Sequence, residues 1–125
     1  GDEIGFIATG ETVVQALLAA ELLEQKGISC RVVSMHTVKP LDEAAVIETA
    51  TKCKAIITVE EHMVHGGLGE ACASHLMQAG ISIPFKIVGI LDEYTATGKQ
   101  LEIFKDYGMT AEGLVDITMK MLKQK

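Results

Sequence analysis

Two carboxylates and two imidazoles lie within six consecutive residues and are the side chains of this chain best suited to chemistry. Glu60 and Glu61 are followed closely by His62 and His65. A carboxylate beside an imidazole can move protons near neutral pH, and the same groups can bind a divalent metal. A general-base role for His62 is therefore chemically reasonable, although nothing in the sequence supplies its substrate.

The spacing of these side chains argues against a metal site. The His-Glu-x-x-His order that sets two ligands on one helix face is absent, and no spaced set of cysteines and histidines completes a tetrahedral site. We therefore expect no metal ligand and no catalytic residue, and interpret His62 and His65 as hydrogen-bonding or interface residues. His75, on the apolar stripe of a helix, is interpreted as a packing residue bonded to a neighbour.

A glycine-rich helix entry follows, and it resembles the fingerprint of dinucleotide-binding domains only in part. About six residues separate the preceding strand from the helix, Cys72 replaces the third glycine, and Glu60 and Glu61 would repel a phosphate. We expect no cofactor-binding residue here. The segment is predicted to be an interface or anion-contact loop consisting of Glu60, Glu61, His62, His65, Gly66, Gly67 and Gly69.

The elements that must position this loop alternate between strands and helices. Strands are expected near residues 4–8, 29–34, 55–59 and 85–90, and helices near 11–26, 43–52, 68–79, 99–107 and from about 111 onward. Asp42 is a predicted N-cap, and Gly27 and Gly80 are predicted left-handed C-terminal caps. The continuous apolar run at 55–59 is typical of a strand covered on both faces. The pattern predicts a three-layer α/β/α fold with a mostly parallel sheet of four to five strands.

Composition narrows the class of protein. The 125 residues are 48% hydrophobic and carry a net charge of −6, which indicates one globular domain over 1–125 with no nucleic-acid partner. No apolar run approaches the roughly 20 residues of a membrane span, so no membrane partner is expected.

Cys30, Cys53 and Cys72 lie in or beside apolar segments, which predicts buried reduced thiols and a cytoplasmic location. A strand begins by about Ile4, so we expect a segment excised from a longer chain.

Four blocks in order carry a resemblance to a known family. They are ATGETVVQALLAAELLEQKGI, RVVSMHTVKPLD, ITVEEHMVHGGLGEA and DEYTATGKQLEIFKDYGMTAEGL. Together they resemble the C-terminal domain of transketolase over nearly the whole chain. The likeness is greatest to the C-terminal section of split transketolases, and related domains occur in deoxyxylulose-phosphate synthases and in the β subunits of 2-oxo acid dehydrogenases.

The resemblance implies an enzyme that uses thiamine diphosphate and Mg²⁺ to transfer a two-carbon ketol unit between sugar phosphates in carbohydrate metabolism. It implies that this third domain binds no cofactor and acts in domain packing at a dimer interface. Its expected partners are the other transketolase domains or an N-terminal subunit, in a homo-oligomer. The Gly-Asp-Gly magnesium motif has no counterpart here, and the glutamate that activates the thiamine ring belongs to another domain, so Glu60 and Glu61 do not inherit its role.

Two other interpretations remain open. The chain could be an autonomous ligand-binding or regulatory α/β domain that uses the loop at residues 61–69. It could also be the same domain from a deoxyxylulose-phosphate synthase or a 2-oxo acid dehydrogenase β subunit, with the substrate chosen by other domains.

Overall fold

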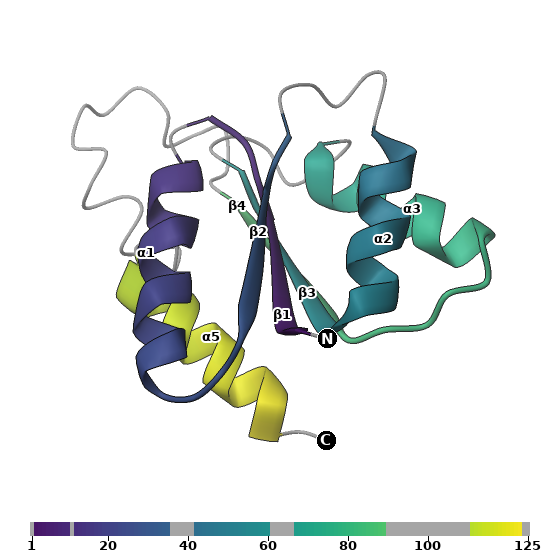
Figure 1. Cartoon of the computed structure of the whole chain (residues 1–125). Helices are drawn as coiled ribbons and strands as arrows, with labels where there is room; N and C mark the ends of the chain where they lie inside the picture. Colours follow the sequence, from purple (N-terminus) through teal and green to yellow (C-terminus); the bar gives the residue numbers. More distant parts are fainter. Residues whose placement is uncertain (1, 11, 36–41, 61–66, 90–110, 124–125) are drawn as a thin grey trace.

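The structure, a computed structural model, describes residues 2–10, 12–35, 42–60, 67–89 and 111–123 (Figure 1). The strands are β1 (Asp2–Ala8), β2 (Cys30–Ser34), β3 (Cys53–Glu60) and β4 (Phe85–Gly89), and the helices are α1 (Thr12–Gln25), α2 (Glu43–Lys52), α3 (Leu68–Gln78) and α5 (Ala111–Lys123). Within the described residues the four strands form one parallel sheet in the order β2-β1-β3-β4. The predicted α/β fold is confirmed, while the helix predicted at 99–107 lies outside the described residues.

The helices cover both faces of the sheet. Helices α1 and α5 pack together on one face, and α2 and α3 pack together on the other (Figure 1). Phe6 and Ile57 of the sheet are fully buried against α1 and α5, and Ile56 of the sheet and Leu68 of α3 are fully buried on the opposite face. Each such side chain contributes roughly 1.5–3 kcal/mol on burial. The apolar run of β3 is therefore buried on both faces, as its sequence predicts.

The predicted helix caps are confirmed. The Asp42 carboxylate accepts a hydrogen bond from the Ala45 amide at 3.1 Å, which satisfies an amide that the first turn of α2 leaves free. Gly27 and Gly80 have φ angles of 83° and 76°, the left-handed conformation that favours glycine after a helix. Strand β3 begins at Cys53, earlier than predicted, because α2 runs directly into it without a loop.

The strand order reverses between β1 and β3. The chain leaves β1 toward β2 on one side of the sheet and returns to place β3 on the other side. In open α/β sheets, ligands bind at the carboxyl ends of the strands where the order reverses in this way. Glu60 is the last residue of β3, so the topology brings the predicted loop to this end of the sheet.

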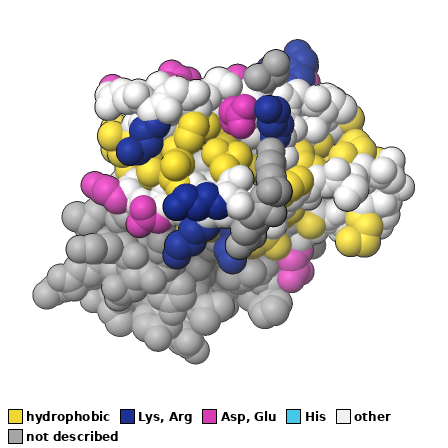
Figure 2. Space-filling model, turned by 90° about the horizontal axis from the view of Figure 1, so that it is seen from below, with side chains coloured by type: hydrophobic (Ala, Val, Ile, Leu, Met, Phe, Trp, Pro, Cys, Tyr) yellow, Lys and Arg dark blue, Asp and Glu magenta, His cyan; other side chains and the backbone are white. Residues whose placement is uncertain are grey.

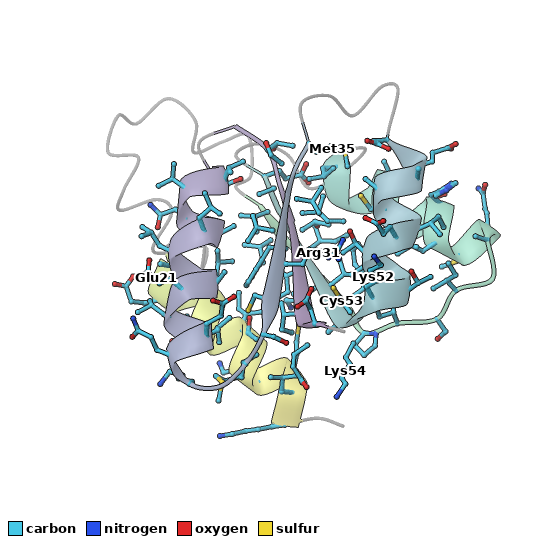
Figure 3. The ribbon with its side chains drawn as sticks, in the orientation of Figure 1. Glu21, Arg31, Met35, Lys52, Cys53 and Lys54 are labelled. Atoms are coloured by element: carbon cyan, nitrogen blue, oxygen red, sulfur yellow. The ribbon has the colours of Figure 1, made fainter. Side chains whose placement is uncertain are left out.

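The opposite end of the sheet, where the strands begin, carries paired charges (Figure 2). Arg31 contacts Glu48 at 3.0 Å and Asp2 at 3.4 Å, and Lys54 contacts Glu3 at 3.0 Å. Figure 3 places Arg31, Cys53 and Lys54 toward this end. Because these pairs are partly exposed to water, each contributes at most about 1 kcal/mol. They link β1 to β2 and β3, and β2 to α2, rather than forming a site.

Candidate functional site

The Glu60 side chain occupies the N-terminus of α3. Its Oε2 atom accepts a hydrogen bond from the Leu68 amide at 2.7 Å, and the Gly69 amide also donates to this carboxylate. The N-cap residue, Gly67, has no side chain to satisfy these amides. Helix N-termini carry free N–H groups and a partial positive charge, so they attract anions. Here the protein's own carboxylate takes the position that a ligand phosphate occupies in nucleotide-binding folds.

The glycines of the segment serve close packing. A Cβ atom on Gly67 would lie 2.5 Å from Glu60 Oε2, and one on Gly69 would lie 2.6 Å from Ile87 Cγ2 and 2.8 Å from Thr58 Oγ1. Real Cβ atoms essentially never approach other atoms so closely. Gly67 therefore leaves room for the Glu60 carboxylate, and Gly69 lets α3 lie directly on β3 and β4. The sequence marks these glycines, but only the structure shows what approaches them.

Burial dominates the electrostatics of this site. Glu60 is only 7% exposed, and its burial raises the pKa of the carboxyl group, although the amides of Leu68 and Gly69 act in the opposite direction. Burial, with a further contribution from the Glu60 charge, raises the pKa of the Cys72 thiol to about 12. A nucleophilic cysteine requires a thiolate, so Cys72 is chemically inert at neutral pH.

The cysteine prediction is largely confirmed. Cys30, Cys53 and Cys72 are all free thiols. Cys53 and Cys72 are buried as predicted, whereas Cys30 is only partly buried because β2 is the edge strand of the described sheet.

Threonines that the sequence analysis did not single out close the region between β1 and β3. The Thr12 hydroxyl donates toward the Val59 carbonyl at 3.0 Å and also contacts the Thr9 carbonyl, while the Thr9 amide donates to Val59 at 3.2 Å. The loop after β1 is thereby tied to the end of β3. Thr58 Oγ1 and Glu60 Oε1 are buried and have no hydrogen-bond partner among the described residues. Threonine is common in strands and loops, so the residue type alone did not predict these contacts.

The structure describes only part of the predicted loop. Glu60, Gly67 and Gly69 lie together at the start of α3, whereas Glu61, His62, His65 and Gly66 lie outside the described residues. The role of the loop as an interface or anion contact thus stays a prediction. In the part of the chain that is described, no three histidine, cysteine or acidic side chains lie close enough to hold a metal ion.

His75 lies at the edge of the α2–α3 pair rather than in the core. Its Nδ1 atom is 3.4 Å from Glu43 Oε2, and the side chain is partly exposed. The prediction that His75 bonds a neighbour is confirmed. Its interpretation as a packing residue agrees with this partly buried position between α2 and α3, whereas Cys72 and Leu76 on the same helix are buried against the sheet.

An apolar groove of about 360 Å³ lies between the second half of α3 and the start of β4. It is lined by Ala73, Leu76, Met77, Gly80, Ile81, Ser82, Ile83 and Phe85. Among the described residues that line the groove, Ser82 alone has a polar side chain, so these residues offer little to orient a charged ligand.

The outward face of α1 carries four of the five large hydrophobic residues that are exposed in the described part of the chain. Val14, Leu17, Leu18 and Leu22 are exposed large hydrophobic residues on this one helix. The inward face, with Ala16, Ala19 and Leu23, is buried against the sheet and α5. A helix with apolar residues on both sides is usually covered by other protein surfaces on both sides. The sequence run VVQALLAAELL shows these apolar residues on both sides of the helix. A search for spaced catalytic residue types does not find such a pattern.

A family model described as "Transketolase, C-terminal domain" matches residues 1–114, almost the whole chain. The chain belongs to the transketolase C-terminal domain family. The resemblance seen in the four sequence blocks is therefore confirmed. None of the described helices of this transketolase C-terminal domain is long and apolar enough to cross a membrane.

Two relatives illustrate the range of proteins that this transketolase C-terminal domain is similar to. A subunit of apulose-4-phosphate transketolase from Phocaeicola vulgatus is 39% identical over 99% of this chain, which spans 39% of that protein. The 1-deoxy-D-xylulose-5-phosphate synthase of Thermomicrobium roseum is 33% identical over 98% of this chain, which spans 19% of that protein. The chain therefore spans about two fifths or less of each relative.

A solved structure agrees with the fold. A split-gene transketolase, described as an inactive β4 tetramer, superposes with a TM-score of 0.87 and 36% sequence identity. The superposition covers 98% of this chain and 40% of that chain. In these two relatives and in this solved structure, the domain is thus one part of a larger protein.

Proposed function

We propose that this chain is the C-terminal, non-cofactor-binding domain of a transketolase and acts in domain packing and oligomerisation. In the complete assembly the enzyme transfers a two-carbon ketol unit between sugar phosphates in the cytoplasm. The similarity to a subunit of a transketolase supports this proposal. The observation that carries the non-binding part is the Glu60 carboxylate, which occupies the α3 N-terminus.

The described residues do not fit thiamine diphosphate and its Mg²⁺ ion. A pyrophosphate would need the free amides of a helix N-terminus, and at α3 these amides already bond Glu60. The region between β1 and β3 is tied together through Thr12 and Val59. We therefore assign no catalytic step to this chain, and the cofactor belongs to other domains or to an N-terminal subunit.

The exposed face of α1 supports the packing role. Leu17 and Leu18 are each about half exposed, and large contiguous apolar patches on soluble proteins mark interaction sites. The related split-gene transketolase is described as a tetramer of its β chain. The proposed partners are accordingly the other transketolase domains, or the N-terminal subunit, and further copies of this chain.

Titration calorimetry tests the non-binding part of the proposal. Thiamine diphosphate with MgCl₂, added to the purified 125-residue chain, is expected to give no heat of binding at micromolar concentrations. The complete assembly serves as the positive control, since it must bind the cofactor to be active. Micromolar binding to the chain alone would overturn the proposal.

The alternative of an autonomous ligand-binding domain is favoured only by the groove beside α3. Its volume of about 360 Å³ is that of a small-molecule site. A thermal-shift screen of nucleotides and sugar phosphates separates the two proposals, because a ligand of the folded state raises the unfolding midpoint as its concentration increases. We expect no shift, whereas a saturable shift would favour the alternative.

A deoxyxylulose-phosphate synthase is the alternative within the same family. The synthase of Thermomicrobium roseum is 33% identical, against 39% for the transketolase subunit. Assaying the complete assembly with an aldose-phosphate acceptor and, as the donor, either a ketose phosphate or pyruvate decides between the reactions. We expect turnover with the ketose phosphate alone.

A further inference from the structure

The apolar groove beside α3 lies along an open edge of the described sheet. Strand β4 (Phe85–Gly89) is last in the order β2-β1-β3-β4, so within the described residues no strand pairs with its outer side. The groove extends over Ile81, Ile83 and Phe85, and Met77 of α3, which also lines it, is 78% exposed. Because α3 and α1 cover opposite faces of the sheet, the groove is separate from the surface to which the packing role is assigned (Figure 1).

The backbone at the outer edge of β4 has hydrogen-bonding groups that point away from the sheet. The Ile56 amide of β3 donates to the Pro84 carbonyl at 3.0 Å, and Ile56 is in register with Phe85. Because backbone groups alternate in direction along a strand, those of Lys86 also face β3, whereas the N–H and C=O groups of Phe85 and Ile87 point outward. Such an edge is a template for another extended chain.

The side chains along this edge set the chemistry of the chain that fits it. Phe85 lies on the α3 side and lines the groove, so Lys86 lies on the opposite side of the sheet. Lys86 is exposed and has no ion-pair partner among the residues that the structure describes. In an added strand, the residue opposite Lys86 lies on the same side as Lys86, and its two neighbours lie over the groove. Since cross-strand pairs of opposite charge are favourable, the edge fits an acidic residue flanked by apolar residues.

We propose that the groove and the edge of β4 together bind an extended segment of a partner protein, which adds a strand to the sheet. The segment carries an acidic residue opposite Lys86, and the apolar residues on either side of it enter the groove. Its backbone bonds the outward groups of Phe85 and Ile87. The described lining residues carry no charge, so these apolar side chains bury none. This peptide site goes beyond the proposed packing role.

Other occupants fit this edge less well. A second copy of β4 has the sequence FKIVG, which contains no acidic residue, so pairing the two edges would leave each Lys86 without an opposite charge. A small apolar molecule would fill the groove but leave the outward backbone groups of β4 to solvent. A peptide with the apolar–acidic–apolar pattern meets both requirements.

Fluorescence anisotropy tests the charge pattern in the complete protein. The probe is a labelled, end-capped peptide, Val-Thr-Val-Glu-Val-Thr-Val, and saturable binding is expected. A matched peptide with lysine in place of the glutamate is expected to bind roughly three- to tenfold more weakly, because an attractive cross-strand pair becomes repulsive. Lys86→Glu, at an exposed position, should reverse this preference. No saturable binding, or equal affinity for the two peptides in both proteins, would overturn the proposal.

A substitution in the groove tests where the peptide lies. Met77→Lys is expected to weaken binding roughly threefold or more, because it brings a charge to an apolar surface. Val14→Lys is the matched control, since Val14 is also exposed, at 57%, but belongs to α1 on the other face of the sheet. It should leave peptide binding unchanged. Equal effects of the two substitutions would show that the peptide does not occupy the groove.

Backbone methylation tests strand addition itself. Two further versions of the glutamate peptide carry N-methyl groups on alternate residues, one version in each of the two possible frames. Methyl groups in the frame that faces β4 remove the hydrogen bonds and should abolish binding, whereas those in the other frame should leave it largely intact. Equal binding of both versions would contradict an added strand.

The outcomes are independent of the proposed function. If the complete protein assembles with its other domains but binds no peptide, the strand addition is wrong while the packing role stands. If Met77→Lys instead lowers the sedimentation coefficient of a protein that binds no peptide, the edge pairs with a second copy, which also overturns the inference.

Discussion

Glu60 shows how one side chain changes the meaning of a motif. A carboxylate next to a glycine-opened helix first resembles a catalytic or ligand-binding group. Its Oε2 atom instead bonds the Leu68 amide at 2.7 Å and fills the anion position from within the chain. Charge at a helix N-terminus stabilises by about 0.3–1 kcal/mol, or up to about 2 kcal/mol when partly buried. Desolvation of the same carboxylate opposes this gain.

The raised pKa of Glu60 predicts a pH dependence of stability. Between the pKa of a glutamate in the unfolded chain, near 4.5, and the higher pKa in the folded state, only the folded protein holds the proton. The free energy of unfolding therefore falls as the pH rises through this interval. Urea unfolding from about pH 4 to pH 8 should show this fall in the parent chain relative to Glu60→Gln, which cannot titrate.

Other acidic groups titrate equally in both proteins, so the difference between them isolates Glu60. A difference that stays flat across the interval, or that rises with pH, would contradict the raised pKa.

The thiol of Cys72 provides a second prediction about a single residue. Its pKa of about 12 and its complete burial predict negligible alkylation by iodoacetamide in the folded protein near pH 7.5. After unfolding in urea, alkylation should proceed at the rate of an ordinary cysteine. Mass spectrometry of peptides measures both rates. Fast labelling of Cys72 in the folded chain would show that α3 opens readily.

Helix α3 illustrates how an element depends on a residue that has no side chain. Gly69 lies where α3 meets β3 and β4, with the Ile87 side chain directly beneath it. Because the Thr58 hydroxyl is also in contact range, even one added methyl group would push the helix away from the sheet. The start of α3 and the Glu60 contact depend on this close approach.

Gly69→Ala is therefore expected to destabilise the chain by about 1–3 kcal/mol through overpacking. Combining it with Ile87→Ala should recover part of that loss, since it removes the Cγ1 and Cγ2 atoms that the new methyl group would meet. A double-mutant cycle by urea unfolding measures this coupling.

Gly27→Ala is the matched control. A Cβ atom on residue 27 would meet no atom within 4 Å. Because φ is 83°, the substitution is expected to cost about 1–2 kcal/mol of stability through the backbone conformation alone. Ile87→Ala should not recover it. Equal coupling for both glycines would contradict the packing account.

At the scale of the whole molecule, the described helices cover both faces of the sheet, but the outward face of α1 is apolar and exposed. One core cluster lies between the sheet and α1 with α5, and the other lies between the sheet and α2 with α3. The outward face of α1 belongs to neither cluster and supports the proposed packing role.

If copies of this chain associate through that face, thermal stability must depend on concentration. The unfolding midpoint of the parent chain is expected to rise as its concentration increases, because association stabilises the folded state by mass action. Leu17→Asp should have a midpoint independent of concentration. Differential scanning calorimetry over a roughly hundredfold concentration range measures this, and equal slopes for the two proteins would argue against the interface.

The sequence by itself determined the fold class, the order of elements and the family. The reason is local: the buried run at residues 55–59, the Asp42 cap and the glycines at 27 and 80 each act on their own neighbours in the chain. Such preferences are visible in single segments. The family followed from four ordered blocks that span nearly the whole chain.

Only the tertiary structure decided what those residues contact. That Glu60 satisfies the α3 amides, that Gly69 lies on Ile87, and that α1 keeps an uncovered apolar face all depend on segments that are distant in sequence. A glutamate looks the same in a sequence whether it awaits a ligand or caps a helix, because its type fixes its charge but not its partner. The partner is set by how the sheet stacks its strands and helices, and that is a property of the whole chain.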